Sequence, residues 1–258
     1  MPLVVVASGK GGVTKTTTTY ALAAAMRESG HAPYMLDLDP GASLTENAGI
    51  IADGDHALAF LNGKGSIEEL STPTLDDIPI VPGTVQLLSS SGTLSEIVTW
   101  AHSLRKAAAD HLIIVDTAQG LGLPATRAAL LAADFIVVPM QAEPMVIKRS
   151  YPDVISMLKV FRRDDDLVRQ FPLAPVLLFA LTKHNGRFAL SRQILDGLAE
   201  SGVQISAYIP MSVTAPEASM TGRSTLSYAP KSPVSEGYRD LARVLIAQLN
   251  SQKLAVLA

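Results

Sequence analysis

Two lysines stand in one glycine-containing segment near the start of the chain, at a spacing suited to binding phosphate. The run SGKGGVTKTTTT contains Lys10 and Lys15 with Gly11 and Gly12 between them. The two glycines let the backbone wrap a phosphate group without side-chain clashes. Lys15 can reach β- and γ-phosphates, and the hydroxyl of Thr16 can hold Mg²⁺. We therefore expect a nucleotide site here.

A strand before this segment and a helix after it must position the two lysines. Leu3–Ala7 is a short β-branched run typical of buried parallel strands, and residues 16–29 carry apolar side chains at helical spacing before Gly30. The unpaired N–H groups at the helix N-terminus attract phosphate. The residues expected to bind the nucleotide are Lys10, Gly11, Gly12, Val13, Thr14, Lys15, Thr16 and Thr17.

Carboxylates follow two other apolar runs. Asp37 and Asp39 end the segment MLDLDP, and Asp116 follows LIIV. Ligands of open parallel sheets bind at the carboxyl ends of the strands, where such acids can hold the water shell of Mg²⁺ or orient an attacking water. A single aspartate at a strand end is more often a helix cap or turn residue. Their joint occurrence with a phosphate loop favours the functional interpretation.

The length and the alternation of strand and helix patterns predict one α/β domain over residues 1–258, with a mostly parallel twisted sheet flanked by helices. Residues 49–74 are the least patterned part. The expected strands are Leu3–Ser8, Pro33–Leu38, Ile78–Val81, Leu112–Asp116, Phe135–Pro139, Val176–Leu181 and Val203–Ile209. The expected helices are Thr16–Ser29, Leu94–Ala109, Leu123–Ala132, Pro144–Phe161, Phe188–Ser201 and Pro233–Leu249.

Composition excludes several classes of protein. There is no apolar run of about 18 residues and no signal-peptide pattern, so we expect a cytoplasmic protein. The chain has no cysteine, which excludes thiolate-bound zinc and iron–sulfur clusters. The formal net charge of −3 gives no sign of a strongly basic nucleic-acid-binding domain.

The two-lysine loop carries a resemblance to a known family. Its form K-G-G-x-x-K-S/T resembles the deviant Walker A motif of the ParA family of partition ATPases, with Lys10 as the signature lysine. The nitrogenase iron protein shares this loop but needs cysteines that this chain lacks. Segments in family order run through nearly the whole chain, as far as the stretch that begins at Tyr238.

The resemblance implies ATP and Mg²⁺ as cofactors and a slow, partner-stimulated ATP hydrolase. It implies that Lys10 crosses a dimer interface to the phosphates held by the other subunit, and that Asp39 orients the attacking water. Asp37 would support the metal shell and Asp116 would be the Walker B acid. Pro210 matches the residue that lines the adenine pocket. The expected catalytic residues are Lys10, Lys15 and Asp39, and the expected metal-site residues are Thr16, Asp37 and Asp116.

Three positions depart from the usual patterns. Thr14 stands where the motif G-x-x-x-x-G-K-S/T has its second glycine, and a β-branched residue tolerates positive φ poorly. Gly41 follows Pro40 where the family usually has glutamine. Ala118-Gln119-Gly120 follows Thr117 in place of a proline-rich second switch. The departures at Gly41 and at Ala118-Gln119-Gly120 are compatible with slower or differently gated hydrolysis, and the cost of Thr14 stays open.

The family also implies partners: a homodimer formed with ATP, non-specific DNA in the nucleoid and a ParB-like centromere-binding or cargo adaptor protein. Arg187 and Arg223 are the first candidates for DNA contacts. Met211 and Thr214 occupy positions where the family usually has arginines, which predicts weaker DNA binding. No helix-turn-helix domain is expected before the first strand.

Two other function classes remain open. The first is a membrane-cycling positioning ATPase of the MinD kind, for which the tail 245–258 is a weak candidate because Lys253 is its only basic residue and it has no aromatic residue. Core packing is the better interpretation of that tail. The second is a metabolic phosphate-loop enzyme such as a dethiobiotin-synthetase-like ligase. Such an enzyme needs Lys15 and Thr16 but has no need of Lys10.

Overall fold

A single sheet organises the described part of the chain, which in this computed structural model comprises residues 1–51, 53–141, 144–184, 198, 200 and 203–257. The strand order is β3-β4-β2-β5-β1-β6-β7-β8, and neighbours pair in parallel except β3 with β4. The strands are β1 Leu3–Val6, β2 Pro33–Leu38, β3 Thr72–Pro73, β4 Pro79–Val81, β5 Leu112–Thr117, β6 Phe135–Gln141, β7 Val176–His184 and β8 Ile205–Pro210.

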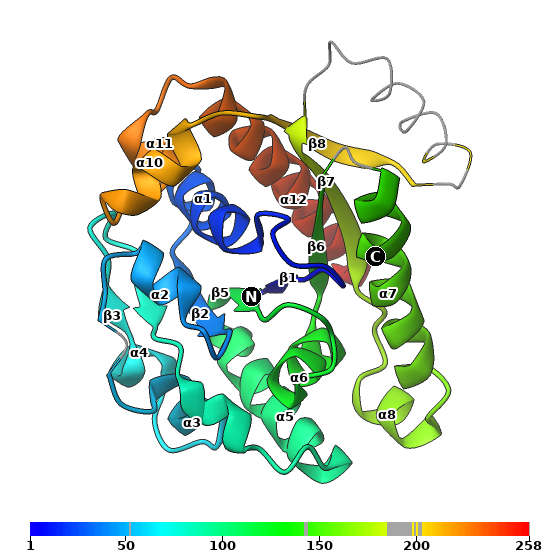
Figure 1. Cartoon of the computed structure of the whole chain (residues 1–258). Helices are drawn as coiled ribbons and strands as arrows, with labels where there is room; N and C mark the ends of the chain where they lie inside the picture. The colour runs from blue at the N-terminus through cyan, green and yellow to red at the C-terminus, as the bar shows by residue number, and fades with distance from the viewer. Residues whose placement is uncertain (52, 142–143, 185–197, 199, 201–202, 258) are drawn as a thin grey trace.

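Helices cover both faces of the sheet, with α1 and α12 together on one face and α5 and α6 on the other (Figure 1). The helices are α1 Lys15–Glu28, α2 Ser43–Asn47, α3 His56–Leu61, α4 Ile67–Leu70, the 3₁₀ helix η1 Val85–Ser89, α5 Leu94–Asp110, α6 Pro124–Ala132, α7 Pro144–Phe161, α8 Asp165–Gln170, α10 Thr214–Met220, α11 Thr225–Tyr228 and α12 Pro233–Leu257.

Strand β1 shows why a continuous apolar run suits this architecture. Successive side chains of a strand point to opposite faces. Leu3 and Val5 belong to the apolar cluster that includes α5 and α6, whereas Val4 and Val6 belong to the cluster that includes α1 and α12. All four side chains are fully buried. The strand at the centre of the molecule is therefore anchored on both faces, and it holds the loop that follows it.

The expected fold class is confirmed, with differences in detail. The expected strands are present with shifts of up to three residues at their ends, and the short edge strand β3 was not anticipated. The sparsely patterned region 49–74 contains two short helices, α3 and α4. Most of the expected helix 188–201 lies outside the described residues. The last helix extends to Leu257. Core packing holds for Leu245, the first residue of the tail, which is fully buried, whereas Ala247, Gln248, Asn250 and Ser251 are exposed.

Candidate functional site

The phosphate loop lies between the end of β1 and the start of α1. Gly12 has φ 74°, and a Cβ built there would meet nothing within 4 Å, so the loop is open on that side. Thr14 is the N-cap residue of α1 with φ 72° and ψ 25°, the left-handed conformation anticipated for the second glycine of the usual motif. The chain thus makes the same turn with a β-branched residue, at a steric cost that glycine would not have.

Neighbouring strands hold this loop from behind. The side-chain amide of Gln141, at the end of β6, donates a hydrogen bond to the carbonyl of Gly12. The hydroxyl of Thr182 on β7 donates to the carbonyl of Val13 at 3.4 Å. The carbonyls are therefore turned toward the sheet, which is the arrangement that leaves backbone N–H groups available for an anion.

Lys15 is the first residue of α1, and its side chain is buried. Burial lowers the pKa of its ammonium group, while the nearby carboxylates of Asp116 and Asp39 act in the opposite direction. A buried cation without a direct ion pair in the described structure is suited to an anionic ligand that supplies the missing negative charge.

The carboxylate of Asp116 lies beneath the start of α1. Its Oδ2 accepts a hydrogen bond from the Thr16 hydroxyl at 2.7 Å, and its Oδ1 accepts one from the Thr19 hydroxyl at 3.3 Å. Thr16 and Asp116 therefore meet as the sequence predicts for a Mg²⁺ site, one supplying a hydroxyl and the other a carboxylate. Burial, reinforced by the charge of Asp37, raises the pKa of Asp116 to about 8. A bound cation would favour its charged form.

Asp37 is fully buried and does not border the cavity that Lys15 enters. Its Oδ1 accepts from the backbone N–H of Asp39 at 3.0 Å, and its Oδ2 accepts from the N–H and hydroxyl of Thr45 at 3.0 and 2.8 Å. A Cβ at Gly83 would lie 2.8 Å from its Cγ, so this pocket is closed around the carboxylate. Asp37 thus shapes the loop that carries Asp39.

Asp39 follows β2 and borders the cavity. Its Oδ1 accepts a hydrogen bond from the N–H of Gly41 at 2.9 Å. The other carboxylate oxygen has no hydrogen bond within the described residues. This oxygen is available to a water molecule or a metal-bound water, consistent with the expected role of Asp39.

A cavity of about 540 Å³ opens over the loop, large enough for a nucleotide. Most of the expected nucleotide-binding residues border it, as does Pro210 at the end of β8. Val13 is buried and Lys10 lies outside the lining. Sequence reasoning missed several lining side chains, because no local pattern connects them to the loop. The missed residues include Ser43, Asn47, Ser219 and Tyr238.

The site fits a nucleotide with Mg²⁺. Lys15 is buried without a compensating ion pair, the loop at Gly12 is open, and Thr16 and Asp116 present oxygen ligands. Within the described residues, no group of three or more His, Asp or Glu side chains is arranged to hold a metal by itself. That agrees with Mg²⁺, which is usually bound through one or two protein oxygens together with substrate phosphates and water.

Lys10 differs from Lys15 in its surroundings. It is only half-buried, and its ammonium group has no hydrogen bond or ion pair with the part of the chain that the structure describes. Its backbone N–H donates to the Ser8 hydroxyl at 3.3 Å, which fixes the loop but leaves the side chain unengaged. One lysine thus enters the cavity of its own chain and the other does not.

The candidate DNA-binding residues are only partly placed. Arg187 lies outside the described residues. Arg223 is 44% exposed, lies 3.6 Å from Asp76 and donates to the Ser227 hydroxyl at 3.2 Å. Arg239 forms ion pairs with Glu28 and Glu236, and Arg243 forms them with Glu236 and Asp240.

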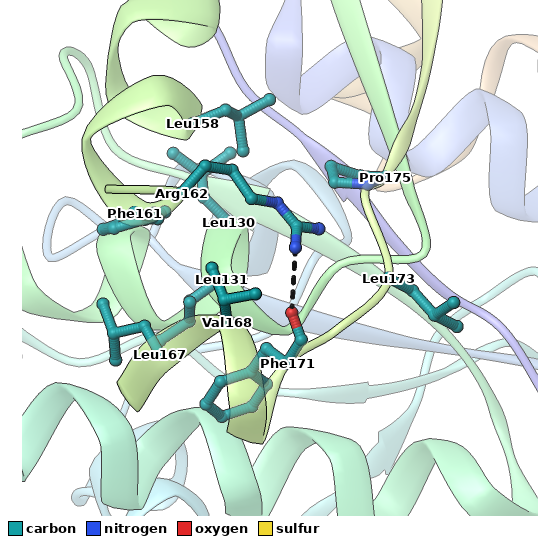
Figure 2. Close-up of a pocket in the computed structure, with 10 residues that line it drawn as sticks. All are labelled: Leu130, Leu131, Leu158, Phe161, Arg162, Leu167, Val168, Phe171, Leu173 and Pro175. Carbon is teal, nitrogen blue, oxygen red and sulfur yellow. Dashed lines mark hydrogen bonds between the residues drawn. The ribbon is translucent and has the colours of Figure 1, made fainter. Parts of the chain in front are cut away.

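A second hollow, formed by α6, α7, α8 and the loop before β7, is not a candidate active site (Figure 2). It is lined almost entirely by apolar side chains, and its volume of about 20 Å³ is far below the volume of about 540 Å³ of the cavity over the phosphate loop. At its rim Arg162 donates to the carbonyls of Phe171 and Pro172 at 3.3 and 3.0 Å.

Comparisons with known proteins identify relatives of the chain. A family model described as an AAA domain matches residues 1–164. The chain is 31% identical over 251 residues to the chromosome-partitioning ATPase Soj of Thermus thermophilus, an alignment that covers 95% of this chain and 96% of Soj. It is 30% identical over 262 residues to the chromosome partitioning protein ParA of Myxococcus xanthus, covering 95% and 87% respectively.

Three solved structures share the fold at lower sequence identity. The ATP complex of a Cyanothece McdA variant has a TM-score of 0.77 at 17% identity, covering 95% of this chain and 96% of that one. Cobyrinic acid a,c-diamide synthase of Mycobacterium smegmatis, with an ATP analogue and magnesium, has a TM-score of 0.72 at 23%, covering 98% and 97%. MinD of Pyrococcus horikoshii with Mg-ADP has a TM-score of 0.67 at 22%, covering 93% of each chain.

The fold and the site define a phosphate-loop ATPase with two lysines in its loop. The chain belongs to the ParA/MinD family of ATPases, as its similarity to the Soj and ParA proteins over 95% of its length shows. It is an ATP hydrolase, and its site is built for ATP with Mg²⁺.

Proposed function

We propose that this chain is a partition ATPase that forms a sandwich dimer with ATP, binds nucleoid DNA without sequence preference and segregates a plasmid, chromosome or other cargo. A ParB-like adaptor would stimulate hydrolysis and so release the dimer. The similarity to chromosome-partitioning proteins of two organisms supports a role in partition. The dimer, DNA binding and the adaptor rest on the arguments below.

The observation that carries the proposal is the different surroundings of the two loop lysines. Lys15 is buried at the cavity, and Lys10 lies outside its lining with no partner in the described structure. A phosphate-loop lysine whose side chain does not enter the cavity of its own chain can neutralise phosphates held by a second copy. In a two-fold dimer each chain would then supply one lysine to each nucleotide. Formation of the dimer would depend on the triphosphate.

DNA binding by the dimer would rely on phosphate contacts alone. Such binding tolerates any sequence and weakens steeply with salt. Both arginines of α12, Arg239 and Arg243, form close ion pairs with acids, and Arg223 lies 3.6 Å from Asp76. We take Arg187, Arg223 and Lys231 as the candidates for DNA contacts. Lys231 is exposed and has no ion pair among the described residues.

A membrane-cycling function of the MinD kind is the alternative. Its support is structural similarity to MinD at 22% identity, which shows the fold alone. None of the described helices has the length and apolar character needed to cross a membrane. A MinD-like mode would instead need an amphipathic helix in the tail 245–258, whose first residue, Leu245, is buried in the core.

The decisive experiment compares the binding of one variant to DNA with its binding to phospholipid vesicles. Asp39→Ala, expected to hold ATP without turnover, is mixed with labelled duplex DNA of random sequence or with anionic phospholipid vesicles, in low salt, with ATP or ADP. We expect ATP-dependent DNA binding and no association with vesicles. Vesicle pelleting with ATP and no DNA shift would replace the partition function with the membrane-cycling one.

A further inference from the structure

Gln119 is one of the polar side chains of the cavity to which the family pattern assigns no role. It follows β5 two residues after Thr117, is exposed and borders the cavity together with Lys15, Thr16 and Asp39. Its amide makes no hydrogen bond within the described residues. It is therefore a free donor and acceptor at the mouth of the site.

The position of this amide relative to the phosphate loop is specific. A Cβ built on Gly11 would lie 2.3 Å from Gln119 Oε1, 2.4 Å from Cδ and 2.9 Å from Nε2. The amide thus lies directly against the Cα of Gly11, where a side chain on residue 11 would displace it. A free glutamine held against the phosphate loop can reach a ligand that the same loop binds.

Asn47, on α2 after β2, also places an amide at the cavity, but its Oδ1 already accepts a hydrogen bond from the Ser219 hydroxyl. Gly41 stands at the position where the family usually has glutamine, and its N–H already occupies one carboxylate oxygen of Asp39. On that side Asp39 is left as the group available to orient water. Gln119, which comes from β5 rather than β2, can supply the missing neutral donor and acceptor.

We propose that the Gln119 amide holds the attacking water together with Asp39 during ATP hydrolysis. The amide carbonyl would accept a hydrogen bond from the water, and the amide N–H would donate to a γ-phosphate oxygen only in the transition state. The water oxygen forms a bond to the γ-phosphorus as the bond to the bridging oxygen of ADP breaks. One water proton stays on the phosphate, and the other passes to solvent. Gln119 gains and loses no proton, as expected for an orienting group.

The substitution Gln119→Ala tests this role. We expect kcat for ATP hydrolysis to fall about 100-fold, as for the loss of a comparable positioning group, with KM, ADP affinity and thermal stability unchanged. Nucleotide-analogue binding gives a readout besides activity. Affinity for ADP with aluminium fluoride, which mimics the transferred phosphoryl with its in-line water, should fall. Affinity for ADP with beryllium fluoride, which mimics bound ATP, should not.

The matched control is Gln204→Ala, which removes an exposed glutamine before β8 that does not border the cavity. It should leave kcat and both analogue affinities unchanged. Gln119→Glu should also hydrolyse slowly, because a carboxylate repels the γ-phosphate and has no N–H to donate. An unchanged kcat in Gln119→Ala would overturn the proposal. Equal weakening of ADP and both analogues would do so too, because it would indicate a structural role.

This inference rests on ATP hydrolysis and not on partition. All of its measurements use purified protein, nucleotide and Mg²⁺, without DNA or an adaptor. A failure of DNA binding would leave the result for Gln119 intact. Conversely, normal hydrolysis by Gln119→Ala would overturn only the water-holding role.

Discussion

Asp37 and Asp116 are direct neighbours across the strands β2 and β5. Both carboxylates are fully buried, and burial raises the pKa of Asp37 to about 6 and that of Asp116 to about 8. Two acids at one register position repel each other when both are charged. The nucleotide-free site therefore favours a proton on Asp116, and a divalent cation would favour its release.

This pair predicts how stability depends on pH without nucleotide. The pKa of Asp116 in the folded protein exceeds its ordinary value of 3.8. Its contribution to stability is therefore fully present below pH 3.8 and is lost as pH rises through about 8. One pKa unit corresponds to about 1.4 kcal/mol. The free energy of unfolding of Asp116→Asn, relative to that of the unsubstituted protein, should therefore be about 1–2 kcal/mol higher at pH 8 than at pH 6. Urea unfolding of both proteins at the two pH values measures this. The same difference at pH 6 and pH 8 would contradict it.

Asp39→Ala should separate binding from turnover. The carboxylate of Asp39 has one hydrogen bond to the loop, so its loss should leave the fold and ATP affinity intact. Hydrolysis per bound nucleotide should fall about 100-fold or more. Single-turnover assays with titrated ATP test this, with the exposed Asp110→Ala as the control. Weak ATP binding with normal turnover would show that Asp39 holds the nucleotide instead.

Thr14→Gly should relieve backbone strain. A left-handed conformation costs a residue with a side chain about 1–2 kcal/mol, whereas glycine adds an entropic cost of about 0.5–1 kcal/mol. The free energy of unfolding should therefore rise by up to about 1 kcal/mol. Thr17→Gly, inside α1, should lower it because glycine is a weaker helix former. Destabilisation by both substitutions would mean that the side chain of Thr14 makes contacts worth more than the strain.

DNA affinity should fall with salt at a log–log slope near −0.9 for each phosphate neutralised. Arg187→Ala and Arg223→Ala should each reduce that slope while leaving ATP binding unchanged. Arg223 has competing contacts with Asp76 and Ser227, so we expect the larger effect from Arg187. Fluorescence anisotropy over a salt series measures both slopes. Identical slopes for all three proteins would place the DNA surface elsewhere.

The parts of the site that sequence could predict depend on short segments. The phosphate loop is one continuous run, and the conformation of Thr14 follows from its place in that run. The meeting of Thr16 with Asp116 also follows from sequence, because parallel strands end at one edge of a sheet.

The parts that sequence could not predict depend on long-range packing. Nothing local indicates that Gln119 lies against Gly11, or that Asn47 on α2 borders the cavity. The helices α3 and α4 have six and four residues, too short for a periodic pattern to be recognised. The hydrogen bonds of Asp37 to Thr45, which hold it outside the cavity lining, likewise cannot be inferred from spacing alone.

The central claim is that Lys10 acts across a dimer, and the molar mass in solution tests it most directly. Light scattering coupled to size exclusion should show a monomer without nucleotide or with ADP, and a dimer with ATP when turnover is blocked by Asp39→Ala. Adding Lys10→Ala to that variant should leave a folded monomer that still binds ATP. Lys64→Ala, which removes an exposed lysine outside the cavity, should leave the dimer intact. A dimer that forms equally with ADP, with ATP and without nucleotide, or one that persists without Lys10, would contradict the account.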